Sequence, residues 1–124
     1  MTREELAAQA VEYKHADCNC CQAVVKALTA DMDVDAEALY NIGAAFGRGM
    51  GCMEGTCGAL VGANIVAGLM GKDKAAKDIL KRFKELSGAT ICGDLKGKGW
   101  KKSRCSCDDC VRNAITAATE ILYI

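Results

Sequence analysis

Apolar residues recur along most of the chain at intervals of three and four, the spacing that places them on one face of an α-helix. The alternation of apolar and polar residues that is typical of strands is nearly absent, and the sequence contains no proline. The pattern therefore predicts an all-α protein, a compact bundle of about six helices. We expect these helices to begin at residues that can cap a helix: Thr2 with Glu5, Asp17 or Asn19, Asp33 or Asp35, Thr56, Asp73, and Asp108 or Cys107.

The most apolar of these helices is predicted to run from Cys57 to about Leu69. Because it is apolar almost all round, we expect it to lie in the centre of the bundle with the other helices packed about it. Its many glycine and alanine residues leave little side chain on its surface, so neighbouring backbones can approach closely. The glycines at positions 47, 49 and 51 predict a tight bend that brings Cys52 and Cys57 inward.

The remaining boundaries follow from the same signals. The second helix is expected to end near Met32 and the fifth at Gly88, whereas residues 89–104 are predicted to be irregular and basic. The inward stripe of the third helix is predicted to be Leu39, Ile42, Ala45 and Phe46, and that of the fifth Ala76, Ile79, Leu80, Phe83 and Leu86. No linker divides the chain, so we expect one cysteine-rich helical domain over residues 1–124.

The chain is long enough to fold without disulfide bonds, so its many cysteines need another explanation. A chain of 124 residues buries roughly two-thirds of its unfolded surface and does not need covalent staples to fold. The sequence opens on a polar helix start without a secretory leader, so the expected compartment is the cytoplasm. The longest apolar run, residues 59–70, is shorter than the roughly 20 residues that span a bilayer, and we expect no membrane span.

Charge is distributed unevenly, although the formal net charge is zero. Residues 1–60 carry four Lys or Arg and nine Asp or Glu, whereas residues 61–124 carry twelve and seven. This polarity suits a homodimer or a charged partner, and it also fits a simple dipolar surface. Nucleic acid is not indicated, because the basic residues lack interleaved aromatics. Segment 96–104 is a dock for an acidic redox partner protein, a counter-charge to an anionic cluster, or an ordinary solvated loop. Its cations are Lys96, Lys98, Lys101, Lys102 and Arg104.

Nine of the residues are cysteine, and most of them lie where a helix is predicted to begin. Unpaired backbone N–H groups at a helix start favour negative charge, and they lower the pKa of a thiol from about 8.5 toward about 3.5–7.5. Thiolate is the form that reacts and binds metals. A cytoplasmic compartment and an odd count both argue against a disulfide framework. The pattern therefore favours metal or redox chemistry.

Several chemistries fit such cysteines. Helix starts suit an anionic iron–sulfur cluster, whose four thiolates leave a net charge of about −2. Pairs such as Cys107/Cys110 or Cys52/Cys57 could instead cycle between dithiol and disulfide without a cofactor, and a structural zinc site is a third reading. In the plainest interpretation most cysteines are small buried hydrophobes. The single histidine, His15, is either a metal ligand or a solvated residue at a helix C-terminus.

Particular residues also resemble a known family. Cys57-Gly58-Ala59-Leu60-Val61-Gly62 is similar to the C-G-A-x-x-G element of a small redox-active family named for its pattern, C_GCAxxG_C_C. Asn19-Cys20-Cys21-Gln22-Ala23-Val24 resembles the family's N-C-A-Q-A-V, with Cys21 in place of alanine, and Cys92 and Cys110 complete its four-cysteine signature. The resemblance implies a redox role in which Cys20, Cys57, Cys92 and Cys110 form the working set.

The leading hypothesis is therefore a redox protein that binds an iron–sulfur cluster, or a related metal-thiolate site, through Cys20, Cys57, Cys92 and Cys110. We expect it to transfer electrons rather than to act as a stand-alone enzyme. Five further cysteines depart from the family pattern and could extend the site, build a second one or act as resolving thiols: Cys52 and Cys107 first, then Cys105, Cys18 and Cys21.

Overall fold

Helices account for most of the computed structural model, which describes residues 1–100 and 102–124. In chain order they are α1 (Arg3–Ala16), α2 (Cys20–Leu28), α3 (Ala36–Gly43), the π-helical turn η1 (Gly49–Met53), α4 (Gly58–Leu69), the 3-10 turn η2 (Asp73–Ala75), α5 (Ala76–Ser87), α6 (Cys92–Lys96) and α7 (Cys107–Leu122). Within the described part of the chain, strand-like pairing is limited to one bridge between Thr56 and Ile91. The all-α prediction is confirmed.

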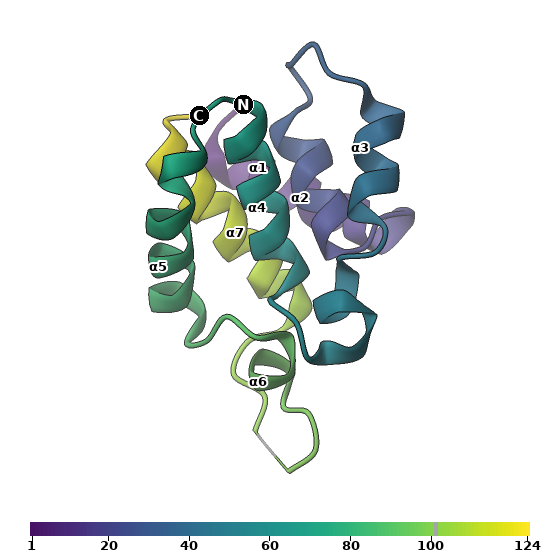
Figure 1. Ribbon diagram of the computed structural model, residues 1–124, viewed down its shortest axis with the longest axis vertical. Coiled ribbons are helices and arrows are strands. Elements are labelled where there is room, and N and C mark those ends of the chain that lie inside the picture. Colours follow the sequence, from purple (N-terminus) through teal and green to yellow (C-terminus); the bar gives the residue numbers. More distant parts are fainter. Residues whose placement is uncertain (101) are drawn as a thin grey trace.

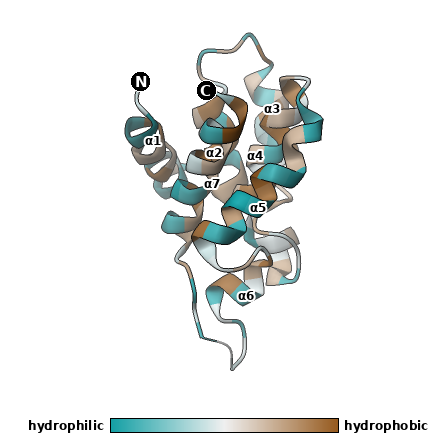
Figure 2. Ribbon diagram, turned by 90° about the vertical axis from the view of Figure 1, so that its left-hand side faces the viewer, coloured by the Kyte–Doolittle hydropathy of each residue, from teal (hydrophilic) through white to brown (hydrophobic). Residues whose placement is uncertain are grey.

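The helices pack around α4 and α7, as Figure 1 shows. Helix α4 contacts α2, α7 and α5, while α1 lies against both α2 and α7. The short helix α6 and the turn η1 contact each other at one end of the bundle, and both chain termini lie at the opposite end (Figure 1). No helix in the described residues has the length and hydropathy to cross a bilayer. Helix α5 presents mainly hydrophilic residues on the side seen in Figure 2, and it buries Ile79 and Phe83.

The central position of α4 follows from its small residues. Ala59, Ala63 and Ala67 are completely buried. At Gly62 a Cβ atom would lie 2.8 Å from the carbonyl oxygen of Cys21 and 3.2 Å from the Cβ of Val24. Helix α2 therefore packs backbone to backbone against this part of α4, as its composition predicted.

Replacing Gly62 with alanine is expected to destabilise the protein by about 1–3 kcal/mol, because the added Cβ presses on the backbone of α2. Gly68 on the same helix is the matched control, since it is exposed and its Cβ would meet nothing within 4 Å. There alanine should stabilise the helix by about 0.4–1 kcal/mol. Chemical denaturation of the two variants measures both effects, and equal stabilities would contradict this packing.

Several boundaries differ from the sequence-based expectation. Helix α2 ends at Leu28 rather than near Met32. At this end the hydroxyl of Thr29 donates a hydrogen bond to the carbonyl oxygen of Val25. Helix α3 ends at Gly43, before Ala45 and Phe46 of the predicted stripe. Ile42 lies within the helix but is 52% exposed. Two predicted inward residues of α5 are also exposed: Leu80 and Leu86.

The segment predicted to be irregular contains α6. Its single turn is closed by hydrogen bonds from the backbone N–H groups of Asp94 and Leu95 to the carbonyl oxygen of Ile91, and it ends at Gly97 in the left-handed conformation. The completely buried Leu95 anchors it to the core. One turn is too short for a periodic pattern to reveal, so the prediction of irregular structure was wrong here.

Candidate functional site: a cavity lined by cysteines

Six of the nine cysteines line one cavity of about 440 Å³, which we call the sulfur cavity. The wall is mainly apolar, with a few cationic and polar side chains among the sulfurs. The cysteines are Cys18, Cys20, Cys57, Cys92, Cys107 and Cys110, and the other lining residues are Lys14, Asn19, Arg48, Met53, Gly58 and Lys96. Segments that are far apart in the sequence therefore bring their sulfurs to one place.

Helix starts position most of these sulfurs. Cys20 is the first residue of α2, and Cys57 is the N-cap of α4 rather than its first residue. The start of α2 is fixed by Asn19, whose side chain accepts a hydrogen bond from the N–H of Gln22 at 2.8 Å. The same amide donates to the carbonyl oxygens of Gly43 and Ala44 at 3.1 Å each, which ties α2 to the end of α3.

The last helix contributes two further sulfurs from its first residues. Cys107 is the first residue of α7 and Cys110 lies one turn later. The hydroxyl of Ser106 accepts a hydrogen bond from the N–H of Asp109 and caps the helix, a role that the sequence analysis had assigned to Cys107 or Asp108. Because serine is a better cap than cysteine, Cys107 is left free to line the cavity.

A glycine packs closely against Cys92, one of the cavity cysteines. Gly49 has a φ of +57°, and a Cβ there would lie 2.4 Å from the Cβ of Cys92 and 2.8 Å from the carbonyl oxygen of Gly55. The predicted tight bend therefore exists, but it packs against Cys92. Of the two cysteines that it was expected to bring inward, Cys57 is buried and Cys52 is exposed.

Cys57 and Cys110 form a hydrogen-bonded pair of sulfurs. This bond lowers the pKa of Cys57 to about 6, with help from the backbone N–H groups of Ala59 and Leu60 and the charge of Lys96, against the opposing effect of burial. The pKa of Cys110 is raised, first by the same hydrogen bond and then by burial. The pair therefore favours a thiolate at Cys57 beside a protonated Cys110.

Lys96 completes this group. Its ammonium donates to the Sγ of Cys110 at 3.1 Å and to the carbonyl oxygen of Cys105 at 3.3 Å. Burial lowers the pKa of Lys96, but its hydrogen bond to Cys110 and the nearby sulfurs outweigh this effect and raise the pKa above its usual value. A lysine cation thus lies beside the two sulfurs. The sequence indicates Lys96 only as one of several cations in segment 96–104 and does not single it out.

At three other cavity cysteines the pKa is raised rather than lowered. Burial raises the pKa of Cys20, although a backbone N–H of Arg48 opposes it. Burial also raises the pKa values of Cys18 and Cys92. In the ligand-free protein a helix start alone is therefore not sufficient to produce a thiolate, because the cost of burying charge competes with it.

Three cysteines lie outside the sulfur cavity. Cys21 is completely buried in the core, and burial raises its pKa to about 12. Cys105 is buried, and its Sγ accepts a hydrogen bond from the amide of Asn113 at 3.7 Å. Cys52 is exposed in η1. His15 also lies away from the cavity and pairs with Asp108 at 2.8 Å.

In the reduced, metal-free protein one thiolate per chain is expected to form with a midpoint near pH 6, the pKa of Cys57. Ultraviolet absorbance of the thiolate against pH measures it. Cys57→Ser should remove this transition, and Cys110→Ala should move it to higher pH, because the donor that stabilises the thiolate is gone. A wild-type titration that begins only above about pH 8 would contradict the assignment.

The cavity does not present a ready site for a single ion. Across residues 1–100 and 102–124, no three His, Cys, Asp or Glu side chains gather closely enough to hold one metal ion directly. The cysteines instead surround an open volume, with Lys96 and Arg48 on its wall. This arrangement suits a larger occupant or a pair of reacting thiols.

The pattern that this geometry reproduces is that of a sequence family described as "Putative redox-active protein (C_GCAxxG_C_C)", which matches residues 18–121. The chain belongs to this family. The matched segment of this C_GCAxxG_C_C protein contains all nine cysteines and every wall residue of the sulfur cavity except Lys14. No curated relative and no solved structure matches the chain significantly.

Proposed function

We propose that the protein is an electron carrier whose sulfur cavity holds an iron–sulfur cluster on Cys20, Cys57, Cys92 and Cys110. The observation that carries this proposal is the gathering of four cysteines from α2, α6, α7 and the N-cap of α4 around one mainly apolar cavity. Four cysteine thiolates are the usual ligand set of such clusters, which supply one-electron transfer when bound. Membership of a redox-active family agrees with this chemistry.

The surroundings of the four cysteines fit an anionic group. A cluster with four thiolates carries a net charge of about −2, and the cavity wall provides the cations Lys14, Arg48 and Lys96. Backbone N–H groups already point at two of the sulfurs, from Arg48 to Cys20 and from Ala59 and Leu60 to Cys57. Such N–H···S contacts raise the reduction potential of a bound cluster.

The same wall supports a cluster better than a structural zinc ion. A single ion draws its ligands to one point, whereas a cluster spreads them around several atoms, as the cysteines here surround a volume. The chain also has a continuous apolar core, so it does not need zinc to fold. Of the five extra cysteines, Cys18 and Cys107 are the two that line the cavity.

One specific observation supports a second function, dithiol–disulfide exchange by Cys57 and Cys110. Their sulfurs are hydrogen-bonded, and Cys57 is the thiolate of the pair. Cys57 would attack a partner disulfide, and Cys110 would then displace the partner's thiolate, so that two electrons pass to the partner and one intramolecular disulfide forms. This pairing differs from the Cys107/Cys110 and Cys52/Cys57 pairs suggested by spacing.

Anaerobic purification distinguishes the two functions. A cluster predicts brown protein containing iron and acid-labile sulfide, with visible absorbance that bleaches on one-electron reduction. Disulfide exchange predicts colourless protein in which mild oxidant removes two thiols, found by mass spectrometry as a Cys57–Cys110 link. A folded, colourless, iron-free protein after chemical reconstitution with iron and sulfide would overturn the cluster proposal.

A further inference from the structure

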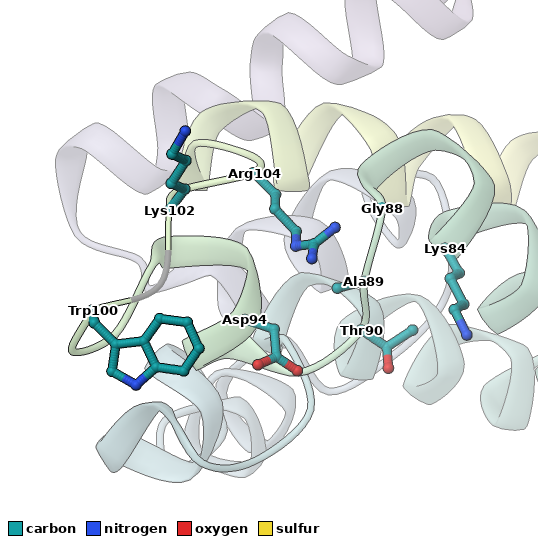
Figure 3. A pocket seen from close by; sticks show the side chains of 8 residues that line it. All are labelled: Lys84, Gly88, Ala89, Thr90, Asp94, Trp100, Lys102 and Arg104. Atoms are coloured by element: carbon teal, nitrogen blue, oxygen red, sulfur yellow. The ribbon is translucent and has the colours of Figure 1, made fainter.

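A second hollow, of about 910 Å³, also borders α6, and cationic side chains outnumber acidic ones on its wall (Figure 3). It is lined by Lys84, Gly88, Ala89, Thr90, Asp94, Trp100, Lys102 and Arg104, and we call it the basic hollow. Lys84 comes from the end of α5, and the other cations come from the loop that joins α6 to α7. Three cationic side chains and one carboxylate give its wall a net charge of +2.

The exposed groups of the basic hollow are those of a docking surface. Trp100 is 92% exposed, which is costly for the largest apolar side chain unless something covers it. Among the described residues, the side chains of Lys84, Lys102 and Arg104 form no salt bridge. Figure 3 shows the Arg104 guanidinium between Trp100 and Lys84. Tryptophan and arginine are the residues that most often dominate binding energy at interfaces.

Residues that line the basic hollow lie next to, or are hydrogen-bonded to, residues that line the sulfur cavity. Thr90 lines the basic hollow, and its carbonyl oxygen accepts a hydrogen bond from the N–H of Cys57 at 2.8 Å. In α6, Asp94 lines the basic hollow whereas Cys92 and Lys96 line the sulfur cavity. A partner bound in the basic hollow is therefore separated from Cys57 and Cys92 by the backbone at Thr90 and by the single turn of α6.

The end of the loop that carries Arg104 is held in place. The backbone N–H groups of Arg104 and Cys105 both donate to the carbonyl oxygen of Leu95, at 2.8 and 3.1 Å. Leu95 is completely buried, so Arg104 is presented from a fixed base. Lys101, part of the predicted basic dock, lies outside the described residues.

We infer that the basic hollow docks a small acidic electron-carrier protein of the ferredoxin type, which exchanges one electron with the sulfur cavity across α6. This inference rests on the proposed cluster. In each encounter the reduced carrier loses one electron and the oxidised cluster gains it, with no bond made or broken. Positive charge around the hollow steers the acidic carrier, and Trp100 supplies the apolar contact that holds it briefly.

The test uses reduced acidic ferredoxin as the electron donor in anaerobic stopped-flow mixing. The variant K84E/R104E reverses two charges of the hollow, and the matched control K74E/K77E reverses two exposed charges in η2 and the first turn of α5, at the opposite end of that helix. At low salt the hollow variant should reduce the second-order rate by about tenfold or more, and the control by less than about twofold. Trp100→Ala should slow transfer at all salt concentrations.

Two companion measurements separate this inference from the cluster proposal. Dithionite, which needs no docking surface, should reduce all variants equally. If dithionite reduces the wild type but ferredoxin transfers electrons equally fast to wild type and K84E/R104E, the docking inference is overturned and the cluster stands. If dithionite finds nothing to reduce, the cluster proposal fails, and calorimetric binding of ferredoxin to the same proteins decides on the dock: binding weakened by K84E/R104E alone supports it, and binding unaffected by that variant or absent overturns it.

Discussion

Replacing Cys57 with serine is expected to lower the iron and sulfide content of the reconstituted protein by at least about tenfold and to abolish its one-electron reduction. Cys57 is the cavity cysteine whose pKa lies near 6, so it provides a thiolate ligand at neutral pH without metal-induced deprotonation. It is also 2% exposed, at the N-cap of α4. Iron analysis and visible absorbance measure the loss.

Cys52→Ser is the matched control for this substitution. Cys52 is exposed in η1 and does not line the sulfur cavity, so the same chemical change there should leave iron content and reduction unchanged. Circular dichroism should show that both variants keep their helices. A Cys57→Ser protein that retains the full cluster spectrum would exclude Cys57 from the ligand set.

Local signals were sufficient to predict the long helices and most of their starts. Thr2 accepts from the N–H of Glu5, and the Glu5 side chain accepts from the N–H of Thr2, as the capping box predicts. Asn19 and Gln22 form a second such box at the start of α2. These motifs act within one turn, so their chemistry can be read from neighbouring residues.

Packing decides what local signals leave open. Ile42 is placed on the inward stripe by its spacing, yet within the folded α3 it is exposed. Helix α6 exists because Leu95 is buried and its carbonyl oxygen receives two N–H groups from the following loop. Neither fact is a property of the local sequence, since both depend on segments that meet only in the folded chain.

The sequence indicated which cysteines would meet in one cavity, but it did not indicate their electrostatics. The resemblance to the family singled out Cys20, Cys57, Cys92 and Cys110, and all four line the sulfur cavity. The argument from helix starts predicted thiolates at several of them, but only at Cys57 is the pKa lowered. At Cys20 burial is the stronger effect, and at Cys110 the retained proton is the one that stabilises Cys57. The outcome depends on how deeply each thiol is buried and on its contacts with distant segments of the chain, and the spacing of cysteines in the sequence gives neither.

Replacing Lys96 with methionine is expected to lower the reduction potential of the site by tens of millivolts. The ammonium lies 3.1 Å from the Sγ of Cys110, and a positive charge stabilises the more negative, reduced state of a cluster. Each loss of about 1.4 kcal/mol of that stabilisation lowers a one-electron potential by about 59 mV. In the metal-free protein the same substitution should raise the pKa of Cys57, because the charge of Lys96 helps to lower it.

Lys98→Met is the control for Lys96→Met, because it removes the same charge two residues later. Lys98 is exposed, pairs with Glu54 at 3.5 Å and does not line the sulfur cavity. Exposed charges are screened by solvent, so its removal should change the potential by only a few millivolts, on the order of a tenth of the Lys96 effect. Anaerobic redox titration of the two variants makes the comparison. Equal shifts would mean that the potential responds to total charge alone, and the contact between Lys96 and Cys110 would then have no special role in setting it.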